Sequence, residues 1–242
     1  MDTAQIATKL VSWIKDTVTN AGCKGTVLGL SGGIDSSVGV VLCKQAFPDT
    51  TLGILIPCYS NPEDAEHAQL IADKFSIPTK TVKLDSIYDS HLAQLANDRE
   101  IDEISRLARA NLKVRLRMVT LYFFANQLHY MVVGSSNKSE LSIGYFTKYG
   151  DSGVDMLPLA NLVKKEVVEL ATFLGIPQEI ITKPPSAGLW EGQTDEEEMG
   201  ITYEELDHYL LTGEASDTTR VRIEAMMAGC THKRRLPPAP DF

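Results

Sequence analysis

The chain of 242 residues is long enough for one substantial α/β domain with an ample core. Its 23 Lys and Arg residues against 32 Asp and Glu residues give a net charge of −9, which opposes nucleic-acid binding and favours small-molecule chemistry. The four cysteines are scattered and no apolar run approaches the length of a bilayer span, so we expect a cytoplasmic protein without disulfides, zinc or a membrane segment.

From the amino terminus onward, helical and strand patterns alternate. Apolar residues at helical spacing predict an amphipathic helix over residues 2–20, and a short apolar run predicts a buried strand over 26–30. The elements expected next are a helix over 38–47, a strand over 51–56, a helix over 62–75 and a strand over 79–84. This alternation predicts a Rossmann-like parallel sheet with helices on both faces, whose ligands bind outside the carboxyl ends of the strands.

Residues 100–127 contain no Pro or Gly and predict one long helix, or two helices that meet near Ala110. The second half is apolar around most of its circumference, which fits either a subunit interface or a core helix of a monomer. A strand over 130–133 follows. It leads into a second polar loop, Gly134 to Glu140.

The loop Ser31 to Ser37 joins the first strand to a helix, and its composition predicts a phosphate site. Gly32 and Gly33 permit a tight turn and a close approach of an anion, and a helix N-terminus attracts negative charge. Asp35 would repel a polyphosphate unless a divalent cation lay between them, which suggests a magnesium nucleotide. The alternative is an ordinary strand-to-helix turn in which Asp35 or Ser36 caps the helix.

The second loop repeats the pattern at the end of the fourth strand. If the two loops lie on neighbouring parallel strands, Glu140 and Asp35 share one cation and the hydroxyl of Ser135 meets a ligand. In the alternative interpretation Ser136 or Ser139 caps the helix and Glu140 is a capping-box acid.

The pattern Gly29 to Gly33 also satisfies Gly-x-Ser-x-Gly, the nucleophile elbow of α/β-hydrolases, with Ser31 as nucleophile. No His-Gly-Gly-Gly stretch offers an oxyanion hole, and Asp35 would oppose a developing oxyanion, so this rival is disfavoured. The Walker sequence and the Gly-x-Gly-x-x-Gly fingerprint are both absent. A phosphate-binding lysine must therefore come from elsewhere in the chain.

Two later segments are also prominent. Residues 183–200 are rich in Gly and Pro, as mobile lids often are, and the acidic run 195–198 is interpreted as a solvated helix start rather than a metal site. The basic cluster 232–235 is either a solvated tail or a phosphate contact in an otherwise acidic chain.

At Ser31 to Ser36 the chain resembles the ATP pyrophosphatases, and further motifs resemble the NAD synthetase family across nearly the whole chain. Those motifs are Asn111 to Met118, Gly144 to Asp151, Asp155 to Leu159, Lys164, Lys183 to Trp190 and His232 to Arg234. The resemblance implies an adenine nucleotide alpha hydrolase-like fold. It also implies a single synthetase domain over residues 1–242, without a glutaminase domain, so that free ammonia is the expected nitrogen source.

The resemblance implies ATP-dependent amidation of deamido-NAD through an acyl-adenylate, giving NAD, AMP and pyrophosphate. The implied ATP contacts are Gly29, Leu30, Ser31, Gly32, Gly33, Ile34, Asp35, Ser36, Ser135, Lys164 and Ser186. The implied magnesium ligands are Asp35, Glu140 and Asp151, and the implied deamido-NAD contacts are Arg115, Lys148, Asp155, His232 and Lys233. A homodimer is implied as well, and no residue is assigned as the acceptor of the proton that ammonia loses.

Overall fold

The computed structural model describes residues 2–97, 100–190 and 192–241. Its sheet has four parallel strands in the order β3-β2-β1-β4, which confirms the predicted α/β architecture. In the central register, Val27 lies opposite Leu52 on one side and Val132 on the other. The strands are β1 (Gly25–Gly29), β2 (Thr51–Leu55), β3 (Thr79–Thr81) and β4 (Tyr130–Val132).

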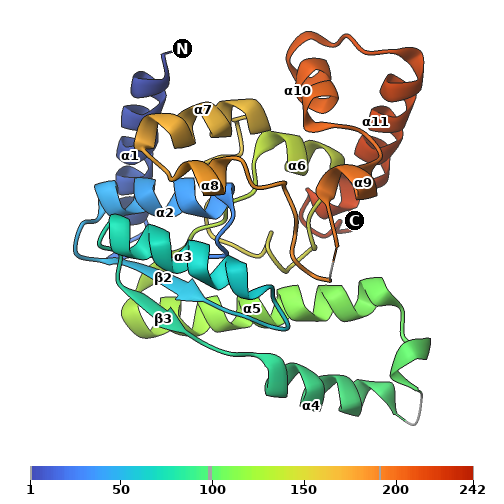
Figure 1. Cartoon of the computed structure of the whole chain (residues 1–242), viewed down its shortest axis with the longest axis horizontal. Helices are drawn as coiled ribbons and strands as arrows, with labels where there is room; N and C mark the ends of the chain where they lie inside the picture. The colour runs from blue at the N-terminus through green and yellow to red at the C-terminus, as the bar shows by residue number, and fades with distance from the viewer. Residues whose placement is uncertain (1, 98–99, 191, 242) are drawn as a thin grey trace.

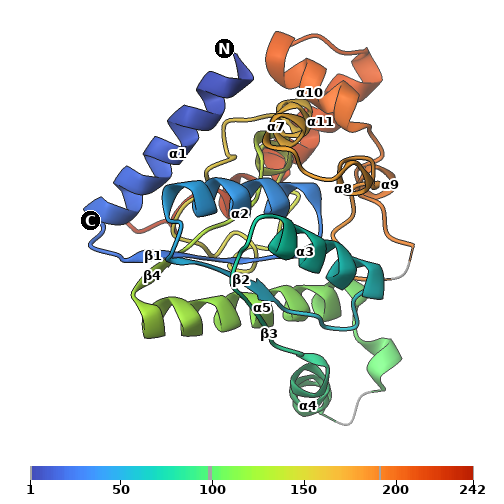
Figure 2. The same ribbon diagram turned by 60° about the vertical axis from the view of Figure 1, so that its left-hand side comes forward.

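Helices cover both faces of the sheet (Figure 2). Successive strand residues point to opposite faces, so Leu28 joins one buried apolar cluster and Val27 joins another. On the Leu28 side lie α1 (Thr3–Asn20), α2 (Ile34–Ala46), α3 (Pro62–Lys74), α7 (Lys164–Leu174) and α8 (Gln178–Ile181). On the Val27 side lie α4 (Asp85–Ala96) and α5 (Arg106–Leu128).

A third apolar cluster lies apart from the sheet, around the fully buried Leu206 and Ile223. Figure 1 shows α9, α10 and α11 gathered at one side of the molecule, away from α1. The elements of this part are α6 (Lys138–Ile143), α9 (Asp195–Met199), α10 (Tyr203–Thr212), α11 (Asp217–Gly229) and the 3-10 turn η2 (Thr231–Lys233).

Several predicted boundaries were wrong. The segment 100–127 forms the 3-10 turn η1 (Ile101–Glu103) and then α5, with the break at residues 104–105 rather than near Ala110. The backbone is extended at Ile104, whose side chain packs against the cluster beneath the sheet, so tertiary packing overrides local helix preference. In addition, α2 begins at Ile34 rather than at residue 38, β3 ends at Thr81, and α4 was not predicted.

The strand order places the candidate site. From β1 the chain moves outward through β2 to β3, and then returns to put β4 on the other side of β1. A crevice outside the carboxyl ends of parallel strands forms at such a switch point. The loops that follow β1 and β4 therefore border the same site. Among the described residues, no helix is long and apolar enough to cross a membrane.

Candidate active site

The first loop turns at Gly32, which has a φ of +81°. A Cβ there would lie 2.2 Å from the carbonyl oxygen of Asp64 in α3, so only glycine fits between the two segments. Gly33 is the N-cap of α2 and no side chain caps this helix, so the proposed capping by Asp35 or Ser36 was wrong. The first N–H groups of α2 thus have no acceptor within the helix and can receive an anion.

The serine hydroxyls of this loop stabilise its shape. Ser31 Oγ lies 2.9 Å from Ser36 Oγ and accepts the N–H of Gly33 at 3.3 Å. The hydroxyls of Ser36 and Ser37 both donate to the carbonyl oxygen of Gly33, at 3.0 and 2.9 Å. The partners of Ser31 are a hydroxyl and an amide, and neither is a general base that could activate a serine nucleophile.

The second loop brings its side chains against the first. Asn137 Nδ2 donates to Asp35 Oδ1 at 2.9 Å, and Lys164 Nζ lies 2.5 Å from Asp35 Oδ2 and 3.6 Å from Glu140 Oε1. All three charged side chains are largely buried, with 8 to 16% of their side-chain surface exposed. The predicted proximity of Asp35 and Glu140 is therefore observed, and Lys164 lies between them.

The capping-box interpretation of Glu140 is confirmed, and it uses only one of the two carboxylate oxygens. Its Oε2 accepts the N–H of Asn137 at 3.2 Å while Asn137 Oδ1 accepts the N–H of Glu140 at 3.0 Å, which is a capping box. Its Oε1 faces Lys164. The cap is Asn137 rather than Ser136 or Ser139. The hydroxyl of Ser139 instead accepts the N–H of Lys164 at 3.0 Å and bonds to Asp207, which holds the start of α7 in place.

The buried charged groups of this cluster shift one another's pKa. Burial and the nearby Asp35 raise the pKa of Glu140. Burial alone would lower the pKa of Lys164, but Asp35 and Glu140 outweigh it and the pKa is raised, so the ammonium stays charged. Paired carboxylate oxygens are hard ligands of the kind Mg²⁺ prefers, so Asp35 and Glu140 fit that ion.

A second group of predicted residues meets around the loop 144–151. Arg115 Nη2 donates to the carbonyl oxygen of Lys148 at 3.3 Å, and Lys148 Nζ donates to that of His232 at 2.8 Å. Lys233 Nζ donates to the carbonyl oxygens of Gly144 and Phe146 at 2.8 and 2.9 Å. The side chain of Lys233 and the backbone carbonyl of His232 therefore hold this loop in place.

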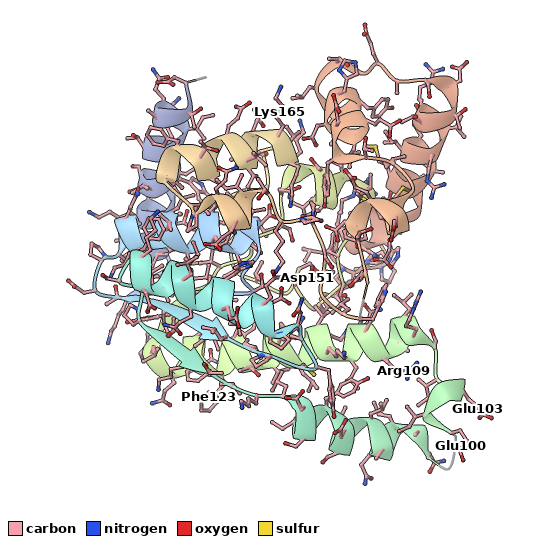
Figure 3. The ribbon with its side chains drawn as sticks, viewed as in Figure 1. Glu100, Glu103, Arg109, Phe123, Asp151 and Lys165 are labelled. Carbon is pink, nitrogen blue, oxygen red and sulfur yellow. The ribbon has the colours of Figure 1, made fainter. Side chains whose placement is uncertain are left out.

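The two predicted aspartates, Asp151 at the end of this loop and Asp155 after it, have different hydrogen-bond partners. Asp151 Oδ1 accepts the N–H of Thr147 at 2.7 Å, and Figure 3 shows Asp151 near the centre of the molecule. No hydrogen bond or ion pair among the described residues joins it to Asp35 or Glu140. Asp155 bonds to the N–H of Val132 in β4 and to the hydroxyl of Tyr122, at 2.8 and 2.9 Å.

Comparison with known proteins identifies the family. The family model described as NAD synthase matches residues 6–237. The chain belongs to the NAD synthase family. It is 51% identical to the NH(3)-dependent NAD(+) synthetase of Carboxydothermus hydrogenoformans, over 96% of this chain and 95% of that protein. It is 44% identical to the enzyme of the same name from Methanocaldococcus jannaschii, over 98% and 97% of the two chains.

Solved structures related to the NAD synthase family confirm the fold. An NMN synthetase from Francisella tularensis superposes with a TM-score of 0.95 at 37% identity, and each chain is covered completely. An NH3-dependent NAD synthetase from Campylobacter jejuni superposes with a TM-score of 0.82 at 29% identity, again with complete coverage of both chains. The adenine nucleotide alpha hydrolase-like fold expected from the sequence is thus confirmed.

The other two residues predicted to contact ATP in this NAD synthase family member, Ser135 and Ser186, lie in loops. Ser135 is half-buried in the loop after β4, and the exposed Ser186 accepts the N–H of Gly188 at 3.1 Å. The segment 183–200 that carries Ser186 is anchored near its start, where Lys183 Nζ lies 2.8 Å from Asp64 Oδ1 and 3.2 Å from His67 Nδ1. Its motion as a lid stays a prediction.

Two contacts of this segment were missed at the level of sequence. Lys183 pairs with Asp64, whose carbonyl oxygen borders Gly32, so the segment reaches the phosphate loop through α3. The buried Lys113 donates from Nζ to the carbonyl oxygen of Leu189 at 3.1 Å. Both lysines lie within motifs that resemble the family, but nothing local indicated a partner 119 or 76 residues away.

Proposed function

We propose that this chain is an ammonia-dependent NAD synthetase, which amidates the nicotinate carboxylate of deamido-NAD at the expense of ATP. The observation that carries the proposal is the meeting of Asp35 and Glu140 beside a phosphate loop whose helix has no side-chain cap. That site suits a magnesium nucleotide, and the relatives named above are NH(3)-dependent NAD(+) synthetases of nearly the same length.

The reaction proceeds in two steps, because a carboxylate has no leaving group that ammonia can displace. A carboxylate oxygen first attacks the α-phosphorus of ATP, the bond to the β-phosphate oxygen breaks, and pyrophosphate leaves. Ammonia then attacks the carbonyl carbon of the acyl-adenylate, the bond from that carbon to the AMP oxygen breaks, and AMP leaves while the nitrogen releases one proton. Bound Mg²⁺ supplies positive charge that offsets the repulsion between the carboxylate and the triphosphate. Holding the carboxylate and ATP in the reactive geometry provides the remaining lowering of the activation barrier.

The residues divide between the two substrates. The loop 29–36, Ser135, Lys164 and Ser186 would bind ATP, while Asp35 and Glu140 would hold Mg²⁺. Asp151 would hold a second ion next to the reacting carboxylate. The deamido-NAD contacts would be Arg115, Lys148, Asp155, His232 and Lys233, several of which also fix the loop 144–151.

A homodimer in the cytoplasm is part of this proposal. One face of α5 packs on the sheet, but Val119 and Phe123 on the other face are 59% and 65% exposed. Figure 3 shows Phe123 on the outer side of α5. A second copy packed against this face would bury these side chains. The four cysteines are all free in this structure, as expected of a protein in a reducing compartment.

A second candidate substrate is nicotinate mononucleotide, because the structure with a TM-score of 0.95 is that of an NMN synthetase. The chemistry at the carboxylate and at ATP would be the same, and only the adenylate half of the dinucleotide would be missing. Asp35, Glu140 and the loop 31–37 would have the same roles with either substrate.

One assay tests both candidates. The protein is incubated with ATP and Mg²⁺, with ammonium or glutamine, and with either deamido-NAD or nicotinate mononucleotide, and AMP, pyrophosphate and the amide are measured. We expect AMP and NAD that depend on both deamido-NAD and ammonium. Faster amidation of the mononucleotide would favour the second candidate. ADP as product, or tight ATP binding with no product under any condition, would contradict the ligase function.

A further inference from the structure

Behind Glu140 lies a set of side chains, two buried and one half-buried, to which neither substrate is assigned. Asp195, at the start of α9, is 5% exposed and accepts hydrogen bonds from Tyr145 at Oδ1 and from Tyr203 at Oδ2, each at 3.0 Å. We name Tyr145, Asp195 and Tyr203 the clasp. These three residues come from the loop after α6, from α9 and from α10, so the clasp joins that loop to two consecutive helices, with Asp195 50 residues beyond Tyr145.

Tyr203 contacts Glu140 and Lys164, two of the three charged residues of the proposed metal site. Its hydroxyl lies 3.4 Å from Glu140 Oε1, and its ring lies 5.0 Å from Lys164 Nζ, measured to the ring centroid. A buried ammonium over an aromatic face is stabilised by the ring quadrupole. The single hydroxyl proton of Tyr203 points either to Asp195 Oδ2 or to Glu140 Oε1. Because the other oxygen of Glu140 is held by the capping box, Tyr203 and Lys164 border the free oxygen.

The clasp also extends toward the segment that carries Ser186. The N–H of Asp195 donates to the carbonyl oxygen of Pro185 at 3.0 Å. The hydroxyl of Tyr145 lies 2.6 Å from Glu198 Oε2, which also accepts Gln193 Nε2 at 2.7 Å. Gln193 Oε1 in turn accepts the N–H of Leu189 at 2.8 Å. The backbone on both sides of Ser186 is thus tied to the residues behind Glu140.

We propose that Tyr203 is a positioning residue, held by Asp195, that couples the docking of residues 193–198 to the orientation of the Glu140 carboxylate. The coupling deepens the proposed function and rests on it, because it assumes that Glu140 is a metal ligand. Partners of metal ligands set ligand orientation, and their loss typically lowers metal affinity or activity about 10- to 100-fold. When residues 193–198 undock, Tyr203 loses its hydrogen bond to Asp195, and its hydroxyl no longer fixes the free oxygen Oε1 of Glu140.

The primary test compares Tyr203→Phe with Tyr209→Phe. Each change removes one hydroxyl from α10, but that of Tyr209 donates to the exposed Glu224. We expect the Mg²⁺ concentration for half-maximal rate to rise about tenfold in Tyr203→Phe and to stay unchanged in Tyr209→Phe. An unchanged Mg²⁺ dependence in Tyr203→Phe would overturn the proposal.

A second readout needs no turnover. The chain has two tryptophans, so in a Trp13→Phe background Trp190 is the sole tryptophan, and its emission, excited selectively over that of the tyrosines, reports on the segment near Gln193. We expect acrylamide to quench Trp190 more strongly in Tyr203→Phe than in Tyr209→Phe, without any ligand. Equal quenching would contradict the coupling. If the wild-type protein formed no amide product, the proposed function would fail while the quenching result still tested the clasp.

A double variant separates positioning from folding. Tyr203→Phe leaves the buried Asp195 carboxylate with one partner fewer, which lowers stability. Adding Asp195→Asn removes that charge, so we expect the double variant to recover thermal stability but not the wild-type Mg²⁺ dependence. Recovery of both would show that the hydroxyl serves folding alone and would overturn the proposal.

Discussion

The loops that follow β1 and β4 face each other across the candidate site, but they are built differently. Loop 31–37 turns at a glycine and starts its helix without a side-chain cap. Its serine hydroxyls form hydrogen bonds within the loop itself. Loop 134–140 starts its helix with a capping box. The first loop therefore leaves backbone N–H groups for an anion, whereas the second satisfies its own N–H groups and presents side chains.

The difference suits the proposed site, which would bind groups of both charge signs. A triphosphate needs positive dipoles, which an uncapped helix start provides without any charged side chain. A cation needs carboxylates held close together against their repulsion. Here Asn137 and Lys164 provide that restraint, the one by donating to Asp35 and the other by lying between Asp35 and Glu140.

The largest expected effect is that of Asp35→Asn on turnover. The change removes a proposed metal ligand, and losing about 4 kcal/mol of charge stabilisation lowers the rate on the order of 1000-fold. The free energy of unfolding should fall by only about 1–3 kcal/mol, because the buried Lys164 still has Glu140 as an ion-pair partner. Steady-state rates and urea unfolding measure the two effects, with the exposed Asp73→Asn as control. A stability loss large enough to explain the rate loss would make Asp35 a structural residue.

Gly32→Ala tests whether the first loop depends on its backbone conformation and on its close approach to α3. The new Cβ would meet the carbonyl oxygen of Asp64, and the φ of +81° is strained for alanine, so we expect a loss of about 2–4 kcal/mol and weaker ATP binding. Gly22→Ala is the matched control, since its φ is +72° and no atom lies within 4 Å of the added Cβ. Equal destabilisation of the two variants would mean that the contact with α3 is unimportant.

The smallest expected effect concerns the second loop. Asn137→Ala removes both the cap of α6 and the donor to Asp35, and should cost about 1–2 kcal/mol of stability. Asn137→Ser keeps a capping oxygen but not the amide donor. We expect the serine variant to regain stability, measured by urea unfolding, while both variants keep the same lowered turnover. Full activity in the serine variant would show that Asn137 acts through the cap alone.

Much of the fold was predictable because its signals are local. The helix over 62–75 has Asn61 as its cap and Pro62 at its first position, and it forms as α3 within one residue of the predicted end. The closeness of Asp35 and Glu140 followed from a single rule, that neighbouring parallel strands end at the same edge. The break before α5 and the shortness of β3 were not predictable, because packing against the sheet decides them.

The amino-acid sequence by itself determined the strand-loop-helix unit around Asp35, the family and the residue types of the site. Only the tertiary structure decided which side chains pair, as in the contacts of Asp35 with Asn137, 102 residues away, and with Lys164, 129 residues away. The physical reason is the distance along the chain over which each kind of interaction acts. Backbone preferences act over a few residues, whereas an ion pair between buried groups exists only after α2, α6 and α7 have packed and removed water from between them.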